Sequence, residues 1–578
     1  MATTRRRRRT PSPRVRLQAV LIITLMVLSL IGGRLLQLQG LDRSKYATLA
    51  QDQAMQKVTL PAVRGAITDR DGHPIAETVD ARDVVADPSQ VVHPAATAAT
   101  LAPLLHRSVG SLTTLLSGAG QYALLAPAVS PALGDAVLKL KLPGITTLDT
   151  NKRVYPSGSL AANVVGYVGS NGAGLGGLEY ADQHLLAGRS GERIFEVGAA
   201  GTPIPDGRNV VKDAVPGTTL RLSLQRDIQW AAQRAIATRV AQTHSLSGTV
   251  IVENPRNGQI LALASAPSFN PNHLATANAA DLGNPAVSDP YEPGSVNKVI
   301  TVSGALQDGL VTPDSPFVIP NTYRYAGTTF HDAETHGTEH LTVTGILGHS
   351  SNIGAIQIAK QLGQQRLYHY LRAFGFGAPT GIGLPGESEG LLPPPSQWSG
   401  TTLPTVSFGQ GIDVTAIQVA TAYSTIANDG VRVEPQLVEG TVGPGGRYRS
   451  APRPAHHRVV SAHVAKQMRR MLQAVVSEEG TAPEAAINGY SVAGKTGTAN
   501  RPNGHGGYSG AGYTASFVGM APANHPKLVC EVVLQRPQGD HFGGSVAGPV
   551  FRSVMSFALQ TMGIPPSFQR PPKLTLKW

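Results

Sequence analysis

An uncharged apolar stretch near the start of the sequence constrains the fold of everything that follows it. Residues 17–33 read LQAVLIITLMVLSLIGG. The apolar stretch can continue past Arg34 to about Leu38, because a long arginine side chain can reach back to the membrane surface. About 20 such residues are enough to cross a bilayer as a helix. We therefore predict a single transmembrane anchor at residues 17–38.

The charges around this stretch predict its orientation. Seven arginines precede it (Arg5–Arg9, Arg14 and Arg16), and no comparably basic segment follows closely. This asymmetry favours a cytoplasmic tail at residues 1–16, with the remaining chain outside the membrane. A cleaved signal peptide would share the basic and apolar regions, but no Ala-x-Ala-like site follows the run. The expected location is the cell membrane, with one pass.

The positive charge of the chain does not indicate a nucleic-acid partner. Residues 1–41 hold eight arginines and no acid, which is two thirds of the net charge of +12. The rest of the chain is too weakly basic for an electrostatic footprint on DNA or RNA. The single cysteine, Cys530, lies in the apolar run KLVCEVVLQ, where we expect a buried strand residue. One cysteine also fits an exported chain without an internal disulfide.

Local patterns divide the exported part into two blocks. The first consists of short strands and turns, with a hairpin signal at Asp71-Gly72, and it ends in a Pro- and Gly-rich linker near residues 201–217. The second opens with a strand and a helix, continues with a hairpin around Asn257-Gly258 and a helical middle, and returns to strands. This order is typical of an α+β fold. The predicted segments are a tail (1–16), an anchor (17–38), a β-rich domain (39–215), an α+β domain (216–565) and a Pro-rich tail (566–578).

Three short motifs follow one another in the second block. They are Ser295-x-x-Lys298, then Ser350-Ser351-Asn352, then Lys495-Thr496-Gly497-Thr498. Chance alone predicts about one Ser-x-x-Lys pair in a chain of this size, so the first motif is weak by itself. All three in this order form the set that penicillin-interacting serine enzymes use. An exported location strengthens that interpretation.

The first motif has the chemistry of an activated serine. Pro293-Gly294 would place Ser295 at a helix amino terminus, where free N–H groups favour developing negative charge. Lys298 lies one turn further along the same face and could take the hydroxyl proton. For that the amine must be neutral, and we expect burial and the nearby cation Lys495 to lower its pKa.

The other two motifs supply a proton relay and a place for a peptide. The Ser350 hydroxyl could pass a proton to a leaving amine, and the Asn352 amide could hold the acyl donor. Lys-Thr-Gly suits an edge strand that accepts an extended peptide, and Gly497 would remove a side chain from its path. An oxyanion hole from the N–H groups of Ser295 and Thr498 would contribute on the order of 3 kcal/mol per donor.

The motifs and several longer segments resemble one family. RGAITDRDG, RVYPSGSLAANVVGYVG, SFGQGIDVTAIQVATAYSTIANDG and GYSVAGKTGTA, together with the three motifs, are similar to class B penicillin-binding proteins, most of all to the division-specific FtsI type. The resemblance covers about residues 58–560. It implies a non-catalytic pedestal followed by a penicillin-binding transpeptidase fold, in which an antiparallel sheet is flanked by helices and an all-helical subdomain.

The resemblance also implies a function. It is a D,D-transpeptidase that cross-links peptidoglycan stem peptides ending in D-Ala-D-Ala, is inhibited by β-lactams and uses no cofactor or metal. A membrane-embedded glycan polymerase of the FtsW kind and other division proteins are the implied partners, at the septum. The implied catalytic residues are Ser295, Lys298, Ser350, Asn352 and Lys495, and the implied substrate-binding residues are Ser351, Thr496, Gly497 and Thr498. Alternatives are an elongation-type enzyme, a D,D-carboxypeptidase or β-lactamase, and a non-catalytic scaffold.

Three further features need a structure to interpret them. Asn297 stands before the motif lysine, where the family usually has an apolar residue, which leaves fine substrate preference open. The run GAGLGG (172–177) resembles a dinucleotide-binding turn, but no βαβ alternation surrounds it, so we predict a structural glycine turn. The run HDAETHGTEH (331–340) gathers potential metal ligands in a spacing that fits no zinc pattern, and we predict a solvated loop.

Overall fold

The computed structural model describes residues 12–42, 45, 54–198, 204–504, 507–567 and 572–578. The predicted basic tail therefore lies mostly outside the described residues. Helix α1 (Pro13–Leu36) and the π-helical turn η1 (Gln37–Leu41) form one continuous element of 29 residues with a mean hydropathy of 2.3 in its most apolar window. None of the residues in α1 is buried. The element has the length and composition of the predicted anchor.

The chain divides into two compact units, which are described separately. The first comprises residues 1–62 and 189–215. After α1 and η1 it contains a three-stranded antiparallel sheet in the order β1 (Met55–Leu60), β6 (Gly191–Glu196) and β7 (Asn209–Lys212). The sheet is thin and largely solvent-exposed, because no helix of this unit packs on it in the described residues. The second unit comprises residues 63–188 and 216–578. The predicted boundaries of the functional domains stay a prediction.

A mixed sheet in the second unit joins strands from both predicted domains. Its order is β17 (Tyr448–Ser450), β16 (Val438–Val442), β8 (Thr219–Leu222), β2 (Ile67–Thr68), β3 (Pro74–Ala86) and β4 (Ala123–Val129), with β5 (Ile145–Val154) also paired to β3. Strands β2 and β8 run parallel. The Asp71-Gly72 hairpin is confirmed, since Gly72 has φ +90° between β2 and β3. Helices α3 (Pro94–Leu105), α4 (Val109–Leu116) and α5 (Pro131–Lys139) form a small separate core with β3 and β4.

The glycine run at 172–177 has a structural reason. A Cβ at Gly174 would lie 1.8 Å from the carbonyl oxygen of Glu179, so the backbone can pass there only without a side chain. The carboxylate of Glu179 is fully buried between Arg64 (2.6 Å) and Arg153 (2.8 Å). The glycines thus let a loop close over a buried ion pair, as the structural interpretation predicts.

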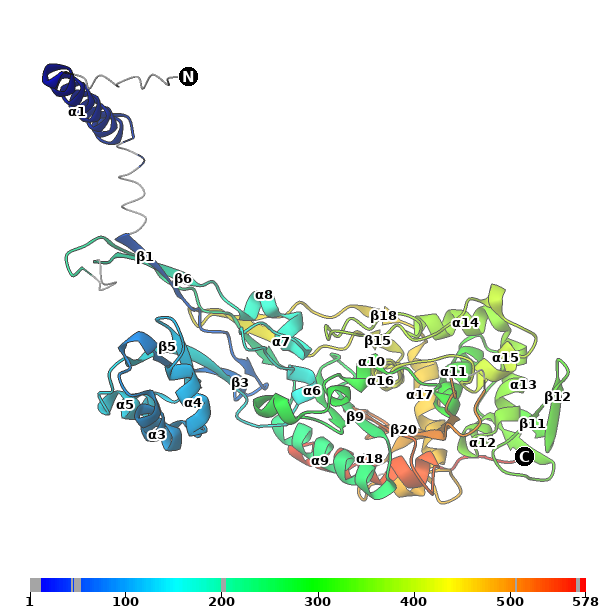
Figure 1. Cartoon of the computed structure of the whole chain (residues 1–578). Helices are drawn as coiled ribbons and strands as arrows, with labels where there is room; N and C mark the ends of the chain where they lie inside the picture. Colours follow the sequence, from blue (N-terminus) through cyan, green and yellow to red (C-terminus); the bar gives the residue numbers. More distant parts are fainter. Residues whose placement is uncertain (1–11, 43–44, 46–53, 199–203, 505–506, 568–571) are drawn as a thin grey trace, which may run out of the picture. The chain divides into compact units, whose positions relative to one another are not determined.

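The main core surrounds a five-stranded antiparallel sheet (Figure 1). Its order is β10 (Ile260–Ala266), β9 (Ser247–Glu253), β21 (Leu528–Gln535), β20 (Tyr513–Ala521) and β19 (Ala493–Asn500). The hairpin at Asn257-Gly258 joins β9 and β10, as predicted. Helices α9 (Arg226–Thr243) and α18 (Gly543–Thr561) pack on one face, and α16 (Ala416–Ala427) packs against the sheet from the helical subdomain. Cys530 in β21 is fully buried, which confirms the expectation for the single thiol.

The sheet order leaves β19 at an edge. In the described residues β19 pairs only with β20, so its other side is open to an added strand. β19 also packs against the turn η5 (Gly294–Asn297) that precedes α11 (Lys298–Gln307). Residues 572–578 of the Pro-rich tail lie along β14 (Glu339–Thr342), where the Thr342 N–H donates to the carbonyl of Leu576 at 3.0 Å. That contact supports α12 (Val343–Gly348), which leads into the second motif.

Candidate active site

The structure brings all three motifs together around one serine hydroxyl. The Ser350 Oγ accepts a hydrogen bond from Lys495 Nζ at 2.8 Å and lies 3.3 Å from Lys298 Nζ. Lys298 Nζ also donates to the carbonyl of Ser350 and, at 2.8 Å, to Asn352 Oδ1. Both lysine side chains are fully buried. Motifs that are far apart in the sequence thus form a single polar cluster.

Ser295 lies in the tight turn η5, one turn ahead of Lys298. Gly294 precedes it with φ +57°, and its N–H donates to the carbonyl of Gly409 at 2.9 Å, which fixes the turn. The Ser295 side chain is half-buried, and its hydroxyl makes no hydrogen bond within the described part of the chain. The predicted contact with the Lys298 amine is therefore not formed in this state, in which that amine is held by Ser350 and Asn352.

Burial makes the two lysines unusual. Loss of solvation lowers the pKa of Lys298 to about 7, while the carboxylate of Asp332 acts in the opposite direction. The pKa of Lys495 lies well below its ordinary value, through burial first and then the nearby Lys298 amine. For Lys298 the predicted direction and the predicted effect of burial both agree, whereas the predicted repulsion between the amines acts on the pKa of Lys495. A lysine with such a pKa can serve as a base near neutral pH.

Asp332 organises the second motif, and the sequence analysis did not identify it. Its carboxylate accepts from Ser351 Oγ at 2.7 Å and from the N–H groups of Asn352 and Ile353, at the amino end of α13 (Asn352–Leu362). His336 Nε2 lies 3.1 Å from the same carboxylate. The Asp332 side chain is only 10% exposed, so the expectation of a solvated loop is wrong at this residue. A hydrogen-bond acceptor at the amino terminus of a helix stabilises the helix and fixes the position of its first residues.

The predicted substrate-binding residues have differing environments. The hydroxyl of Ser351 is buried, donates to Asp332 and accepts from Gly354 N–H at 2.9 Å, so the geometry favours capping of α13. Thr496 Oγ1 lies 2.9 Å from Thr481 Oγ1, and Thr498 Oγ1 accepts from Gly543 N–H at 3.1 Å.

The structure explains the glycine at position 497 by a cause other than the one predicted from the sequence. A Cβ there would lie 2.3 Å from Ser516 Oγ on β20 and 3.1 Å from the Pro293 carbonyl oxygen. The close packing of β19 on its own sheet and on Pro293, just before the turn η5, therefore excludes a side chain at this position.

Asn297 does not face the polar cluster. It is fully buried, and its Nδ2 donates to the carbonyl of Val406 at 2.6 Å, in α15 (Thr402–Ser407). The neighbouring Thr301 donates to the carbonyl of Ser407 at 2.8 Å. Asn297 thus anchors the helix of the first motif to the helical subdomain, which explains a polar residue at this position without a direct role in substrate selection.

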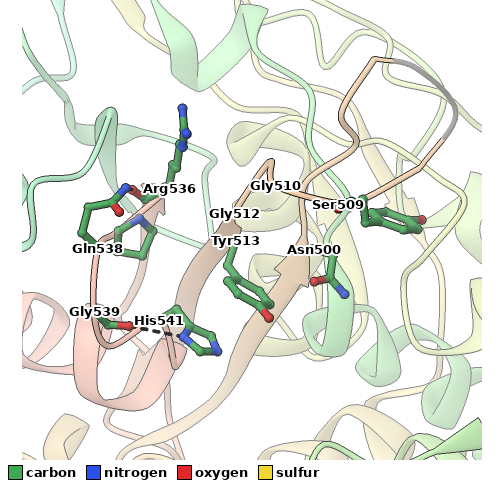
Figure 2. A pocket seen from close by; sticks show the side chains of 11 residues that line it. Asn500, Ser509, Gly510, Gly512, Tyr513, Arg536, Gln538, Gly539 and His541 are labelled. Carbon is green, nitrogen blue, oxygen red and sulfur yellow. Dashed lines mark hydrogen bonds between the residues drawn. The ribbon is translucent and has the colours of Figure 1, made fainter.

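A polar pocket lies beyond the end of β19 (Figure 2). It has a volume of about 600 Å³ and is lined in part by Asn500, Tyr513, Arg536 and His541. The rings of Tyr513 and His541 stack with centroids 4.0 Å apart. Asn500, the last residue of β19, is only two residues beyond Thr498. No spacing in the sequence predicts the pocket, since three separate segments form it.

The metal interpretation of the run at 331–340 finds no support. Among the described residues, the one group of acids and histidines close enough to hold an ion is Asp69, Asp71 and His73, in the β2–β3 turn. Asp69 is already engaged there by the N–H groups of Asp71 and His73. The turn is therefore a hydrogen-bonded loop of the pedestal region.

Comparisons with known proteins agree with this geometry. The penicillin binding protein transpeptidase domain matches residues 248–556, and the penicillin-binding protein dimerisation domain matches residues 59–222. The chain belongs to the class B penicillin-binding proteins, which combine these two domains.

Relatives match over nearly their whole length. Penicillin-binding protein PbpB of Mycolicibacterium smegmatis is 36% identical over 96% of this chain and 92% of its own. Peptidoglycan D,D-transpeptidase FtsI of Escherichia coli K12 is 33% identical over 94% of this chain and 91% of its own. The aztreonam complex of penicillin-binding protein 3 from Mycobacterium tuberculosis superposes with a TM-score of 0.72 at 34% identity, covering 90% of this chain and 100% of that structure.

Proposed function

We propose that this chain is a peptidoglycan D,D-transpeptidase that works through an acyl-enzyme on Ser295. The observation that carries the proposal is the convergence of two buried, low-pKa lysine amines on Ser350 Oγ, beside a free serine hydroxyl and an open strand edge. The related E. coli protein, which matches over most of both chains, is named a peptidoglycan D,D-transpeptidase. The aztreonam complex of the mycobacterial relative supports β-lactams as inhibitors of this chain.

The first half-reaction forms the acyl-enzyme. A stem peptide ending in D-Ala-D-Ala pairs along β19, with Asn352 and Thr498 as contacts. Neutral Lys298 takes the proton of Ser295 Oγ as the oxygen bonds to the carbonyl carbon of the penultimate D-Ala. The tetrahedral oxyanion lies against the N–H groups of Ser295 and Thr498. The C–N bond then breaks, and the departing D-Ala amine receives the proton through Ser350, which both lysines contact.

The second half-reaction transfers the peptide. An amine of a neighbouring stem peptide attacks the ester carbonyl and loses its proton to Lys298 through the same relay. The C–O bond to Ser295 breaks, and its oxygen regains a proton. One amide bond and one free D-Ala result from each cycle, so no cofactor or oxidant is required.

The product distribution tests the reaction. With a D-Ala-D-Ala stem peptide and an acceptor amine, the full-length chain in detergent should yield cross-linked peptide and equimolar D-Ala, measured by mass spectrometry. Omitting the acceptor amine is the control. Release of tetrapeptide as the main product even with the acceptor present would indicate a carboxypeptidase, and rapid hydrolysis of penicillin would indicate a β-lactamase.

We also infer that the chain acts in septal wall synthesis, with its amino terminus in the cytoplasm and its catalytic domain outside. The apolar helix α1, the basic residues before it and the relatedness to the FtsI and PbpB proteins support this. A membrane-embedded glycan polymerase of the FtsW kind is the proposed partner. A fluorescent fusion should concentrate at division sites in growing cells. A fusion spread along the side wall would favour the elongation-type alternative.

A further inference from the structure

Two glutamates lie buried together in the main sheet, close to the nucleophile turn. Glu253 ends β9, and Glu531 lies in the middle of β21. In the antiparallel register Glu253 stands opposite Val529, so Glu531 is its diagonal neighbour on the same face. Both side chains are at most 1% exposed. The face they share is covered by α16.

No cation balances these two carboxyl groups in the described residues. The titratable groups on that face are Tyr291, before the turn η5, and Tyr423 on α16, whereas Cys530, next to Glu531 on β21, points to the opposite face of the sheet. Burial raises the pKa of Glu253 to about 8, with the nearby Ser424 hydroxyl acting against it. Burial also raises the pKa of Glu531 well above its ordinary value, and Glu253 adds to the effect. Because a lone buried carboxylate is costly, both groups are neutral at pH 7.

One hydrogen bond and a short stretch of backbone connect Glu531 to Ser295. The Tyr291 hydroxyl donates to Glu531 Oε1 at 2.7 Å. The backbone of Tyr291 pairs with Val414 in both directions at 2.9 Å, so the tyrosine is held at its ring and at its main chain. Four residues further along lies Ser295.

A second tyrosine holds the other side of the turn. The Tyr423 hydroxyl donates to the carbonyl of Val296 at 2.9 Å. Two buried tyrosines thus hold the turn that carries Ser295: Tyr291 precedes it in the chain, and Tyr423 donates to its backbone. A negative charge on Glu531 would act electrostatically on both tyrosines. A change in the charge of Glu531 would act on both supports at once.

We propose that Glu531, uncharged beside Glu253, is a positioning residue that holds Ser295 in place through Tyr291, and that ionisation of the glutamate pair slows acylation. The inference rests on the proposed acylation of Ser295. A charge on either acid is poorly solvated in the sheet interior, and a second charge is repelled by the first. The strand, Tyr291 and the turn must then shift, and a small displacement of a nucleophile is enough to lower its reactivity.

The pH dependence of acylation tests the proposal. In the full-length chain in detergent, the labelling rate with fluorescent penicillin should rise through about pH 7 and fall above about pH 8. Glu531→Gln, which keeps an acceptor for Tyr291 and cannot ionise, should keep the rise and lose the fall. Glu253→Gln should lose the fall as well. Tyr291→Phe should label about tenfold more slowly at neutral pH, since it lacks the hydrogen bond.

A matched control separates positioning from loss of a buried hydroxyl. Tyr370→Phe removes a comparable hydrogen bond outside the site, which joins the tyrosine hydroxyl to Asp308 Oδ1 at 2.6 Å. This variant should be labelled at the wild-type rate. A fall above pH 8 that persists in both glutamine variants would overturn the proposal, as would full-rate labelling of Tyr291→Phe. Absence of labelling in the wild type would instead contradict the proposed function.

The protonation of the glutamate pair can also be tested through thermal stability, without measuring activity. A carboxyl whose pKa is raised in the folded state makes the protein lose stability as pH rises from its unfolded value, near 4.5, to about 8. The melting temperature of the wild type should therefore fall across that range more than that of Glu253→Gln. Equal slopes would show that the pair is not protonated, and would overturn the proposal even if Glu531→Gln failed to fold.

Discussion

Replacing Ser295 with alanine should abolish covalent labelling by penicillin. The proposed ester forms on Ser295 Oγ, in the turn η5 that packs against the edge strand β19. Removal of a catalytic nucleophile commonly lowers turnover by on the order of 10⁶, so no labelled band should be visible after gel electrophoresis of membranes.

Ser303→Ala provides a control on the same helix. Ser303 is buried in α11, and its hydroxyl makes no hydrogen bond in the described residues, so removing it should leave labelling unchanged. A labelled Ser295→Ala protein would show that another group carries the acyl chain. Ser350 would then be the first candidate, because two amines already contact its oxygen.

Short-range spacing in the sequence was enough to predict the three motifs and the two hairpin turns. Lys298 follows Ser295 by one helical turn, and a Gly after Asp or Asn marks a turn whose backbone needs φ above zero. These relations depend on neighbours in the chain. The same holds for the apolar element that contains α1, which is recognised by length and hydropathy alone.

Other parts of the site depend on tertiary contacts that no spacing encodes. Asp332 reaches the start of α13 only because its loop folds back on Ser351 and Asn352. A side chain at Gly497 is excluded by atoms of β20 and of Pro293, which are distant in the sequence. Likewise, the sequence shows Glu531 only as an ionisable residue in an apolar strand and does not indicate its contact with Tyr291. A buried charge in such a strand is the signal that could have identified it.

Replacing Lys298 with arginine should lower the acylation rate about 10³-fold at neutral pH. The guanidinium group keeps the charge and hydrogen-bonding capacity but does not lose its proton in proteins. A base near its optimal pKa contributes 10²–10⁴-fold, which sets the expected size. Stopped-flow measurement with a chromogenic β-lactam gives the rate. Lys360→Arg, an exposed lysine on α13, should react at the wild-type rate.

The pH dependence distinguishes a base from a merely structural cation. If neutral Lys298 accepts the Ser295 proton, the wild-type rate rises about tenfold per pH unit below pH 7 and levels off between about pH 7 and pH 8, where the fall assigned to the glutamate pair begins. Asp332 raises the pKa of Lys298, so Asp332→Asn should move this rise to lower pH, even if the weaker cap of α13 lowers the maximal rate. A rise at unchanged pH in Asp332→Asn would place the titrating group elsewhere.

Lys298 should make the stability of the protein rise with pH, whereas the glutamate pair should make it fall with pH. The folded pKa of about 7 lies below the unfolded value of 10.5, so the unfolded chain binds more protons between these values and stability rises with pH there. Lys298→Met should reduce that rise, to which the buried Lys495 also contributes, whereas Glu253→Gln should reduce the decline at lower pH, to which Glu531 also contributes. Unchanged slopes in Lys298→Met would mean that the amine is protonated in the folded enzyme, and an ammonium group could not act as the base.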